Sequence, residues 1–151
     1  MAISEKNLLL ALSNEEPQYF EILAHLDEKA IAYLSVLSKG KDTMLATKAI
    51  FLAGIYNKPS GYAILESAAK STVLLKRIAS ASALEYMPEI KRDKLAEKLI
   101  GDADISIQKL VIKATGNTKS AKLREKFAKL SKDSSSKFIR DLVSALPQPI
   151  P

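Results

Sequence analysis

The side chains best placed to do chemistry are lysines that recur at helical spacing in the second half of the chain. Two groups share this spacing: Lys91, Lys94 and Lys98, and then Lys119, Lys122, Lys126 and Lys129. Residues three and four apart share one face of an α-helix, and like charges placed so destabilise it slightly. Such a ridge attracts phosphate groups, which predicts a polyanion- or partner-binding surface. The alternative is a solvated helix face, with a positive field diluted by interspersed acidic residues.

Metal and acid–base chemistry have little support in the sequence. The chain has one histidine, His25, and no cysteine. The pair Asp102 and Asp104 is similar to the start of a calcium loop, but Ile107 and Lys113 occupy the positions that require glycine and glutamate. Phosphate-loop, dinucleotide and serine-hydrolase motifs are absent from the sequence. We therefore predict no enzyme, cofactor or metal; an enzyme built from Asp, Glu, Lys and Tyr alone is the alternative.

Composition favours one folded domain over residues 1–151. The chain is 47% hydrophobic, too apolar for a disordered protein. Its longest apolar run, residues 49–56, is far shorter than the ~20 residues that span a bilayer. The absence of cysteine fits a reducing compartment. We expect a cytoplasmic, unprocessed protein without a membrane segment.

Charge is distributed unevenly along the chain. Residues 1–86 hold nine basic and nine acidic side chains, whereas residues 87–151 hold fourteen and eight. The net charge of +6 therefore lies entirely in the second part, since 14 − 8 = 6. This asymmetry indicates an acidic or polyanionic partner, or else a feature that keeps the chain soluble.

A weak repeat of about thirty residues organises the elements that carry these side chains. Its clearest copy, residues 101–116, reads GDADISIQKLVIKATG. Aligned on Gln108, the other copies place Ala46, Lys76 and Arg140 at the same position, with spacings of 30, 32 and 32 residues. Small or branched apolar residues one before, three after and six after this anchor form a helical stripe. Repeats of this period are typical of stacked helical hairpins.

The repeat predicts two sets of helices. The first set comprises residues 42–56, 71–86, 104–116 and 134–146, with N-caps at Asp42, Ser71, Asp104 and Ser134. The partner helices comprise residues 28–39, 60–70, 88–100 and 118–132, starting near Asp27, Ser60, Pro88 and Thr118. Shorter helices are expected over 4–12 and after Pro17. Gly54 and Gly116 are expected to end two helices of the first set.

The third copy resembles the HEAT-repeat family, in its short bacterial form. The matching residues are Asp102, Asp104, Ile107, Lys109, Val111, Ala114 and Gly116. Gln108 stands where that family usually has arginine, whereas Lys76 and Arg140 keep a basic residue. The resemblance implies an all-α, right-handed α-solenoid of about four hairpins over 28–146, an N-terminal helical cap over 1–27 and a proline-rich tail over 147–151. Members range from scaffolds to chromophore-lyase relatives and DNA-repair glycosylases, so the family fixes no function.

In such a stack the first set of helices lines a groove. The candidate groove-lining residues are Lys76, Arg77, Lys109, Lys113 and Arg140. Their registers do not form an unbroken basic ladder, and the alternative is that the family's basic residue at this point pairs with a turn aspartate, which is a structural role. The apolar first helix, with Leu8 and Leu12, either caps the stack or mediates self-association.

The functional prediction is a non-catalytic scaffold that binds an unidentified protein partner through the helical surface. The alternative is a nucleic-acid-binding module, or a relative of the HEAT-like DNA-repair proteins, that uses the basic second part. Scarce aromatic residues weigh against base stacking, since there is no tryptophan and only Phe127 and Phe138 lie in that part.

Overall fold

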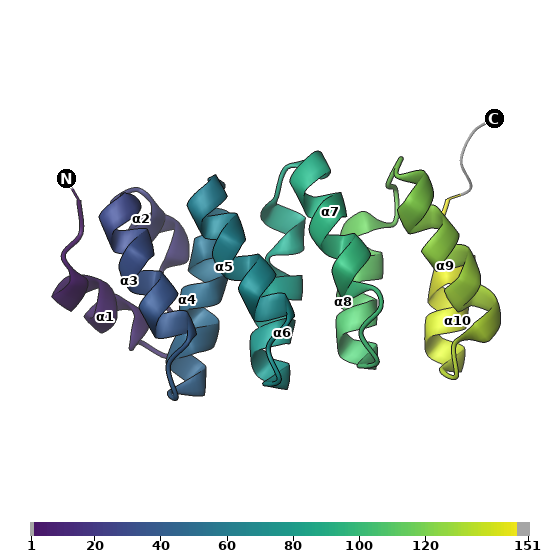
Figure 1. Ribbon diagram of the computed structural model, residues 1–151, viewed down its shortest axis with the longest axis horizontal. Helices are drawn as coiled ribbons and strands as arrows, with labels where there is room; N and C mark the ends of the chain where they lie inside the picture. Colours follow the sequence, from purple (N-terminus) through teal and green to yellow (C-terminus); the bar gives the residue numbers. More distant parts are fainter. Residues whose placement is uncertain (1, 148–151) are drawn as a thin grey trace. The chain divides into compact units, whose positions relative to one another are not determined.

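The computed structural model describes residues 2–147, and within them the chain is 71% helical and has no strand. This confirms the all-α prediction. Figure 1 shows the helices in chain order: α1 (Glu5–Leu12), α2 (Tyr19–Leu23), α3 (Glu28–Ser38), α4 (Thr43–Ile55), α5 (Pro59–Ala69), α6 (Leu74–Ser82), the 3₁₀ helix η1 (Leu84–Tyr86), α7 (Glu89–Leu99), α8 (Ile105–Thr115), α9 (Ala121–Asp133) and α10 (Lys137–Ser144). In this described part, every helix is too short or too polar to cross a membrane.

The helices form two compact units, Met1–Tyr86 and Met87–Pro151. The boundary between the units falls where the charge balance changes. The first unit has nine basic and nine acidic side chains, and the second has fourteen and eight. The positive excess is therefore a property of the second unit.

Helix α4 is the centre of the first unit, because it packs against α1, α2, α3, α5, α6 and η1. Helices α3 and α5 contact each other in one layer, and α4 and α6 do so in a second (Figure 1). The core of α4 includes Ala46, Ala49, Ile50 and Ala53, all fully buried. Three of these four side chains are single methyl groups, which lets neighbouring helix backbones approach closely.

Two glycines make this close packing sterically feasible. A Cβ atom at Gly54 would lie 2.5 Å from the Cβ of Ala83, and a Cβ at Gly61 would overlap the carbonyl oxygen of Ala53. Neither glycine has a positive φ angle. The need for glycine is therefore space rather than a left-handed backbone. Gly54 was predicted to end its helix, but it lies inside the last turn of α4, which continues to Ile55.

The second unit has the same two-layer plan. Helix α7 packs against α8 and α9, and α10 packs against α8 and α9. The core contains Leu99, Ile107, Ile112 and Leu123, each at most 2% exposed. Gly116 is the C-cap of α8 with ordinary helical angles, so glycine is again required for space.

Helix starts that depend on aspartate agree with the sequence prediction. Asp27, Asp42 and Asp104 each accept a hydrogen bond from the backbone N–H three residues later, at 2.8, 3.1 and 3.3 Å. These bonds satisfy donors that the first helical turn leaves unpaired. Pro88, expected near the start of its helix, is the N-cap of α7.

The predicted hydroxyl caps Ser71 and Ser134 are wrong by two residues, and the N-cap of α9 lies two residues after Thr118, near which a helix start was predicted. The hydroxyl oxygens of Ser71, Thr118 and Ser134 accept hydrogen bonds from the N–H groups two residues later. Each therefore forms a short turn, and the residue that ends this turn is the N-cap of α6, α9 or α10. Helix α5 starts at Pro59, one residue before the predicted Ser60.

A polar side chain closes the turn before four helices, α6, α8, α9 and α10; before α9 it is Arg124, whose guanidinium donates to the Thr118 carbonyl oxygen at 2.8 Å. Arg77, Gln108 and Arg140 each donate to the carbonyl oxygen six residues earlier, at 3.1, 2.8 and 2.6 Å. The anchor of the second repeat is therefore Arg77, and the predicted anchor, Lys76, is wrong by one residue. The corrected spacings are 31, 31 and 32 residues (77 − 46, 108 − 77 and 140 − 108). This one-residue error in the anchor explains why Leu75, which was expected on the buried stripe, is 48% exposed.

The last helix, α10, is shorter than the predicted 134–146. It buries Ile139 and Val143, but Phe138, which was expected on the buried side, is 52% exposed. Pro147 follows in non-helical backbone. The rest of the predicted proline-rich tail, residues 148–151, lies outside the described residues.

Candidate functional site

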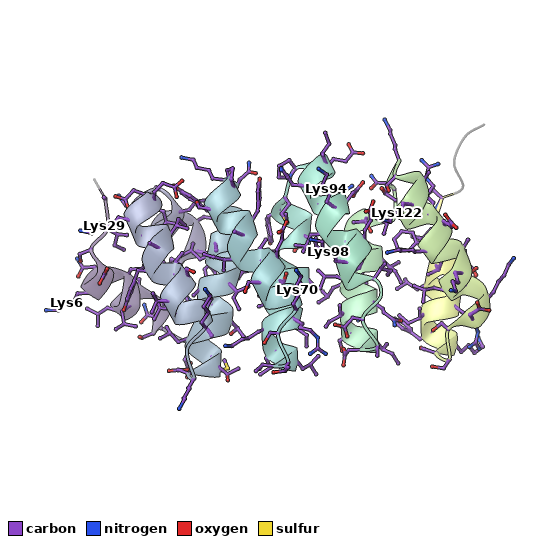
Figure 2. All side chains as sticks on the ribbon, viewed as in Figure 1. Lys6, Lys29, Lys70, Lys94, Lys98 and Lys122 are labelled. Carbon is purple, nitrogen blue, oxygen red and sulfur yellow. The ribbon has the colours of Figure 1, made fainter. Side chains whose placement is uncertain are left out.

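The two predicted lysine groups lie on helices that pack side by side in the second unit, α7 and α9, with Lys119 just before α9. Glu97 of α7 occupies the junction between them. The ammonium of Lys126 donates to the Glu97 carbonyl oxygen at 2.6 Å, and that of Lys122 lies 3.7 Å from the Glu97 carboxylate. Figure 2 shows Lys94, Lys98 and Lys122 on the ribbon of this unit. Two of the predicted phosphate-binding lysines therefore interact with α7 itself.

Four other lysines of these groups are exposed and form no hydrogen bond or ion pair with the described residues. They are Lys94, Lys98, Lys119 and Lys129. Lys91 is also exposed. The aromatic residue of α9, Phe127, is 4% exposed and cannot stack on a base. The surface is thus a set of separate cations that can attract an anion, without help from the Phe127 ring.

The basic residues predicted to line a groove mostly hold turns. Arg77 and Arg140 close the turns described above, and the ammonium of Lys76 donates to the carbonyl oxygen of Gly40 at 3.1 Å. A hydrogen bond from a charged donor to a carbonyl oxygen is stronger than one from a neutral donor. These three cations have a structural task, and they perform it through backbone carbonyl oxygens, whereas the alternative interpretation of the sequence expected a turn aspartate as partner.

The other two groove candidates differ in their surroundings. The ammonium of Lys109 lies 5.7 Å from the ring centre of Phe138, close enough for a cation–π contact. Lys113 is exposed on α8. The half-exposed position of Phe138 thus gives its ring a partner at the surface rather than in the core.

A buried carboxylate that the sequence analysis missed ties α7 to the turn before α9. Asp93 accepts a hydrogen bond from the hydroxyl of Thr118 at 2.5 Å and one from Arg92 at 3.0 Å. Asp93 is 8% exposed and Thr118 is 4% exposed. The group is satisfied by partners of its own unit, which indicates a structural role rather than acid–base work.

The most distinctive surface lies in the first unit and was not predicted. We define the aromatic surface as Tyr19 and Phe20 of α2, Phe51 of α4 and Tyr86 of η1. The ring centres lie 4.9 Å apart for Tyr19 and Phe51, 5.6 Å for Phe51 and Tyr86, and 5.8 Å for Phe20 and Tyr86, all edge to face. Phe20 is 62% exposed and Tyr86 is 44% exposed. Two aromatic rings are therefore held in fixed geometry at the surface of this unit.

Residues far apart in the chain build the aromatic surface, because α2 and η1 both pack against α4. Phe51 sits between Tyr19 and Tyr86 and links the rings into one chain of contacts. Partial burial raises the pKa of the Tyr19 phenol, so this ring stays neutral at physiological pH. Only composition offered a signal in the sequence: seven of the nine aromatic residues lie in residues 1–86, namely all five tyrosines and two of the four phenylalanines.

The hollows and the acidic side chains of the described residues offer weaker candidates for a functional site. Two shallow hollows occur, one of about 380 Å³ between α3 and α5 and one of about 930 Å³ beside α9 and α10. Serine and alanine side chains supply much of the lining of the smaller hollow. Among the described residues, no three histidine, aspartate or glutamate side chains gather as a metal site.

Comparison of the chain with protein-family models finds no match, and comparison with curated proteins finds none either. The case for a function therefore depends on the surfaces of the two units.

Proposed function

We propose that this protein is a non-catalytic protein-interaction module of the HEAT-like α-solenoid type, and that the aromatic surface of its first unit contacts the partner. The exposed, edge-to-face ring cluster is the observation that carries the proposal. The cysteine-free composition fits the predicted cytoplasmic location.

Aromatic side chains supply much of the binding energy of protein interfaces. Phe20 and Tyr86 have large exposed areas, so a partner that covers them gains apolar burial. Their contacts with each other and with Phe51 restrict the rings before binding. Less side-chain entropy is then lost when the partner binds.

The solenoid part of the proposal has separate support. A side chain that donates to the carbonyl oxygen six residues earlier recurs at the anchors Arg77, Gln108 and Arg140, with spacings of 31 and 32 residues, and occurs also at Arg124 of α9. Each unit also pairs its helices in two layers. A repeated hairpin with a repeated turn is the architecture that the resemblance implies.

Site-specific photo-crosslinking in the source cells tests the proposal. A photoreactive phenylalanine analogue replaces Phe20 in one protein and Phe138 in another, since both side chains are about half exposed or more. We expect discrete crosslinked products at position 20 that are absent at position 138. Equal products at both positions, or none at position 20, would remove the aromatic surface as the contact site.

A second candidate function, polyanion binding by the second unit, is favoured by one observation: all of the net charge of +6 belongs to that unit. Fluorescence anisotropy with labelled RNA and DNA at two salt concentrations tests it. Lys119→Glu with Lys129→Glu should weaken binding and lower the salt slope, because each lost phosphate contact removes about 0.9 from it. The matched control is Lys29→Glu with Lys70→Glu, two exposed lysines of the first unit (Figure 2). Equal weakening by both pairs, or no binding at low salt, would count against this function.

A further inference from the structure

We propose that the aromatic surface binds a cationic segment of the partner, one that presents arginine or lysine side chains to Phe20 and Tyr86. This inference rests on the proposed function of that surface and names the chemistry of its partner. Three features of the first unit carry it: the charges beside the rings, the role of the nearest lysine and the orientation of the rings.

The elements that carry the two exposed rings bear acidic side chains and no basic ones. Glu21 follows Phe20 in α2, and Glu85 precedes Tyr86 in η1. Glu16 lies four residues before Phe20, and all three carboxylates are exposed to solvent. The first unit is neutral as a whole, so this is a local excess of negative charge. A cation approaching the rings therefore meets a favourable field.

The nearest lysine on α4 does not provide this cation. Lys48 lies three residues before Phe51, one helical turn away, but its ammonium donates to the carbonyl oxygen of Asn14 at 2.6 Å. That bond directs the ammonium toward the connection between α1 and α2. The exposed rings of Phe20 and Tyr86 have no cation–π contact among the described residues, unlike the ring of Tyr56, which has Lys58 5.1 Å away.

The orientation of the rings suits a planar cation. Phe20 meets Tyr86 at an interplanar angle of 63°, and Tyr86 meets Phe51 at 90°. In edge-to-face pairs each ring contact occupies an edge or one face, so the exposed rings retain aromatic surface that attracts cations. A guanidinium group can stack on a ring and at the same time donate hydrogen bonds to a carboxylate. An arginine side chain can therefore contact the aromatic rings and the neighbouring carboxylates at the same time.

Other occupants fit less well. The carboxylates of Glu16, Glu21 and Glu85 repel a nucleic acid or an acidic peptide. A second copy of this chain offers cations from its second unit, and this occupant is an outcome of the test.

The test is a selection from a random peptide display library on the full-length protein. The binding-deficient variant is Phe20→Ala with Tyr86→Ala, and the matched control is Phe138→Ala, which removes another half-exposed ring. Circular dichroism checks that each variant is folded. We expect selected peptides to be enriched in arginine and lysine, to bind the double variant about tenfold more weakly and to bind the control unchanged. Glu21→Gln with Glu85→Gln should weaken binding several-fold and flatten its salt dependence.

The outcomes separate the inference from the proposed function. Enrichment of neutral or acidic peptides that still require Phe20 and Tyr86 would overturn the cationic partner but keep the aromatic surface as a binding site. Peptides that bind the double variant as tightly as the wild type would overturn both. Sedimentation that shows self-association of the wild type, abolished in the double variant, would replace the peptide by a second copy.

Discussion

Gly54→Ala is the substitution that most directly tests how closely the helices of the first unit pack. The added Cβ would lie 2.5 Å from the Cβ of Ala83 and 3.1 and 3.2 Å from the two methyl groups of Leu65. The added Cβ thus meets two neighbours of α4: α5, through Leu65, and the C-cap of α6, Ala83. Overpacking usually costs about 1–3 kcal/mol, and a Cβ–Cβ distance of 2.5 Å places this site in the upper part of that range, about 2–3 kcal/mol. Alanine has a helix propensity about 1 kcal/mol better than glycine, which offsets part of this cost. We expect a net loss of about 1–2 kcal/mol.

Urea unfolding followed by tyrosine fluorescence measures this loss in the relevant unit. All five tyrosines lie in residues 1–86 and the chain has no tryptophan, so the signal reports the first unit. The control is Gly101→Ala, followed by circular dichroism. Gly101 is exposed, and a Cβ there would be 3.7 Å from the nearest atom beyond its chain neighbours, the Lys98 carbonyl oxygen. This variant should be as stable as the wild type or up to about 1 kcal/mol more stable.

A compensating substitution makes the result specific. Ala83→Gly removes the methyl group that the new Cβ of Gly54→Ala would strike. The double variant should therefore be more stable than the sum of the two single effects, with a coupling of about 1–2 kcal/mol. A neutral Gly54→Ala, or two effects that simply add, would refute the close packing of α4 against this position.

Three further predictions concern single side chains. Gln108→Arg should stabilise the protein by about 1 kcal/mol in urea unfolding. The buried Oε1 atom of Gln108 has no hydrogen-bond partner among the described residues. Arginine has no such acceptor atom, and its guanidinium can still donate to the carbonyl oxygen of Asp102. Asp93→Ala should cost about 3 kcal/mol in the same assay, since it leaves the buried partners of that carboxylate unpaired. Burial raises the pKa of the Tyr19 and Tyr62 phenols, so their contribution to stability is complete below pH about 10 and is lost as the pH rises through the raised values. In a tyrosinate absorbance titration, Tyr19→Phe and Tyr62→Phe should each remove one late ionisation step.

Helical class and helix order were predictable because the sequence repeats its signals locally. The caps at Asp42 and Asp104 were placed correctly, although the Asp102 carboxylate shows that aspartate also accepts the N–H two residues later. The serine caps were not placed correctly, because their hydroxyls accept the N–H two residues later as readily as they cap a helix. Lys76 and Arg77 are adjacent cations, so composition alone could not decide which of them closes the turn.

The surfaces were harder to predict than the helices. Helical spacing grouped the lysines of α7 and α9 correctly on neighbouring helices, but it could not show that Glu97 engages Lys122 and Lys126. The aromatic surface joins Phe20, Phe51 and Tyr86 through tertiary packing. No periodicity connects such positions, so only the structure brings them together.

Chemical-shift mapping tests the central claim most directly. A peptide of alternating glycine and arginine is titrated into ¹⁵N-labelled protein, and the amide signals are followed. We expect the shifts to concentrate in α2, η1 and the part of α4 around Phe51, and we expect Phe20→Ala with Tyr86→Ala to abolish them. Shifts confined to residues 87–147, or unchanged by that double substitution, would contradict the claim.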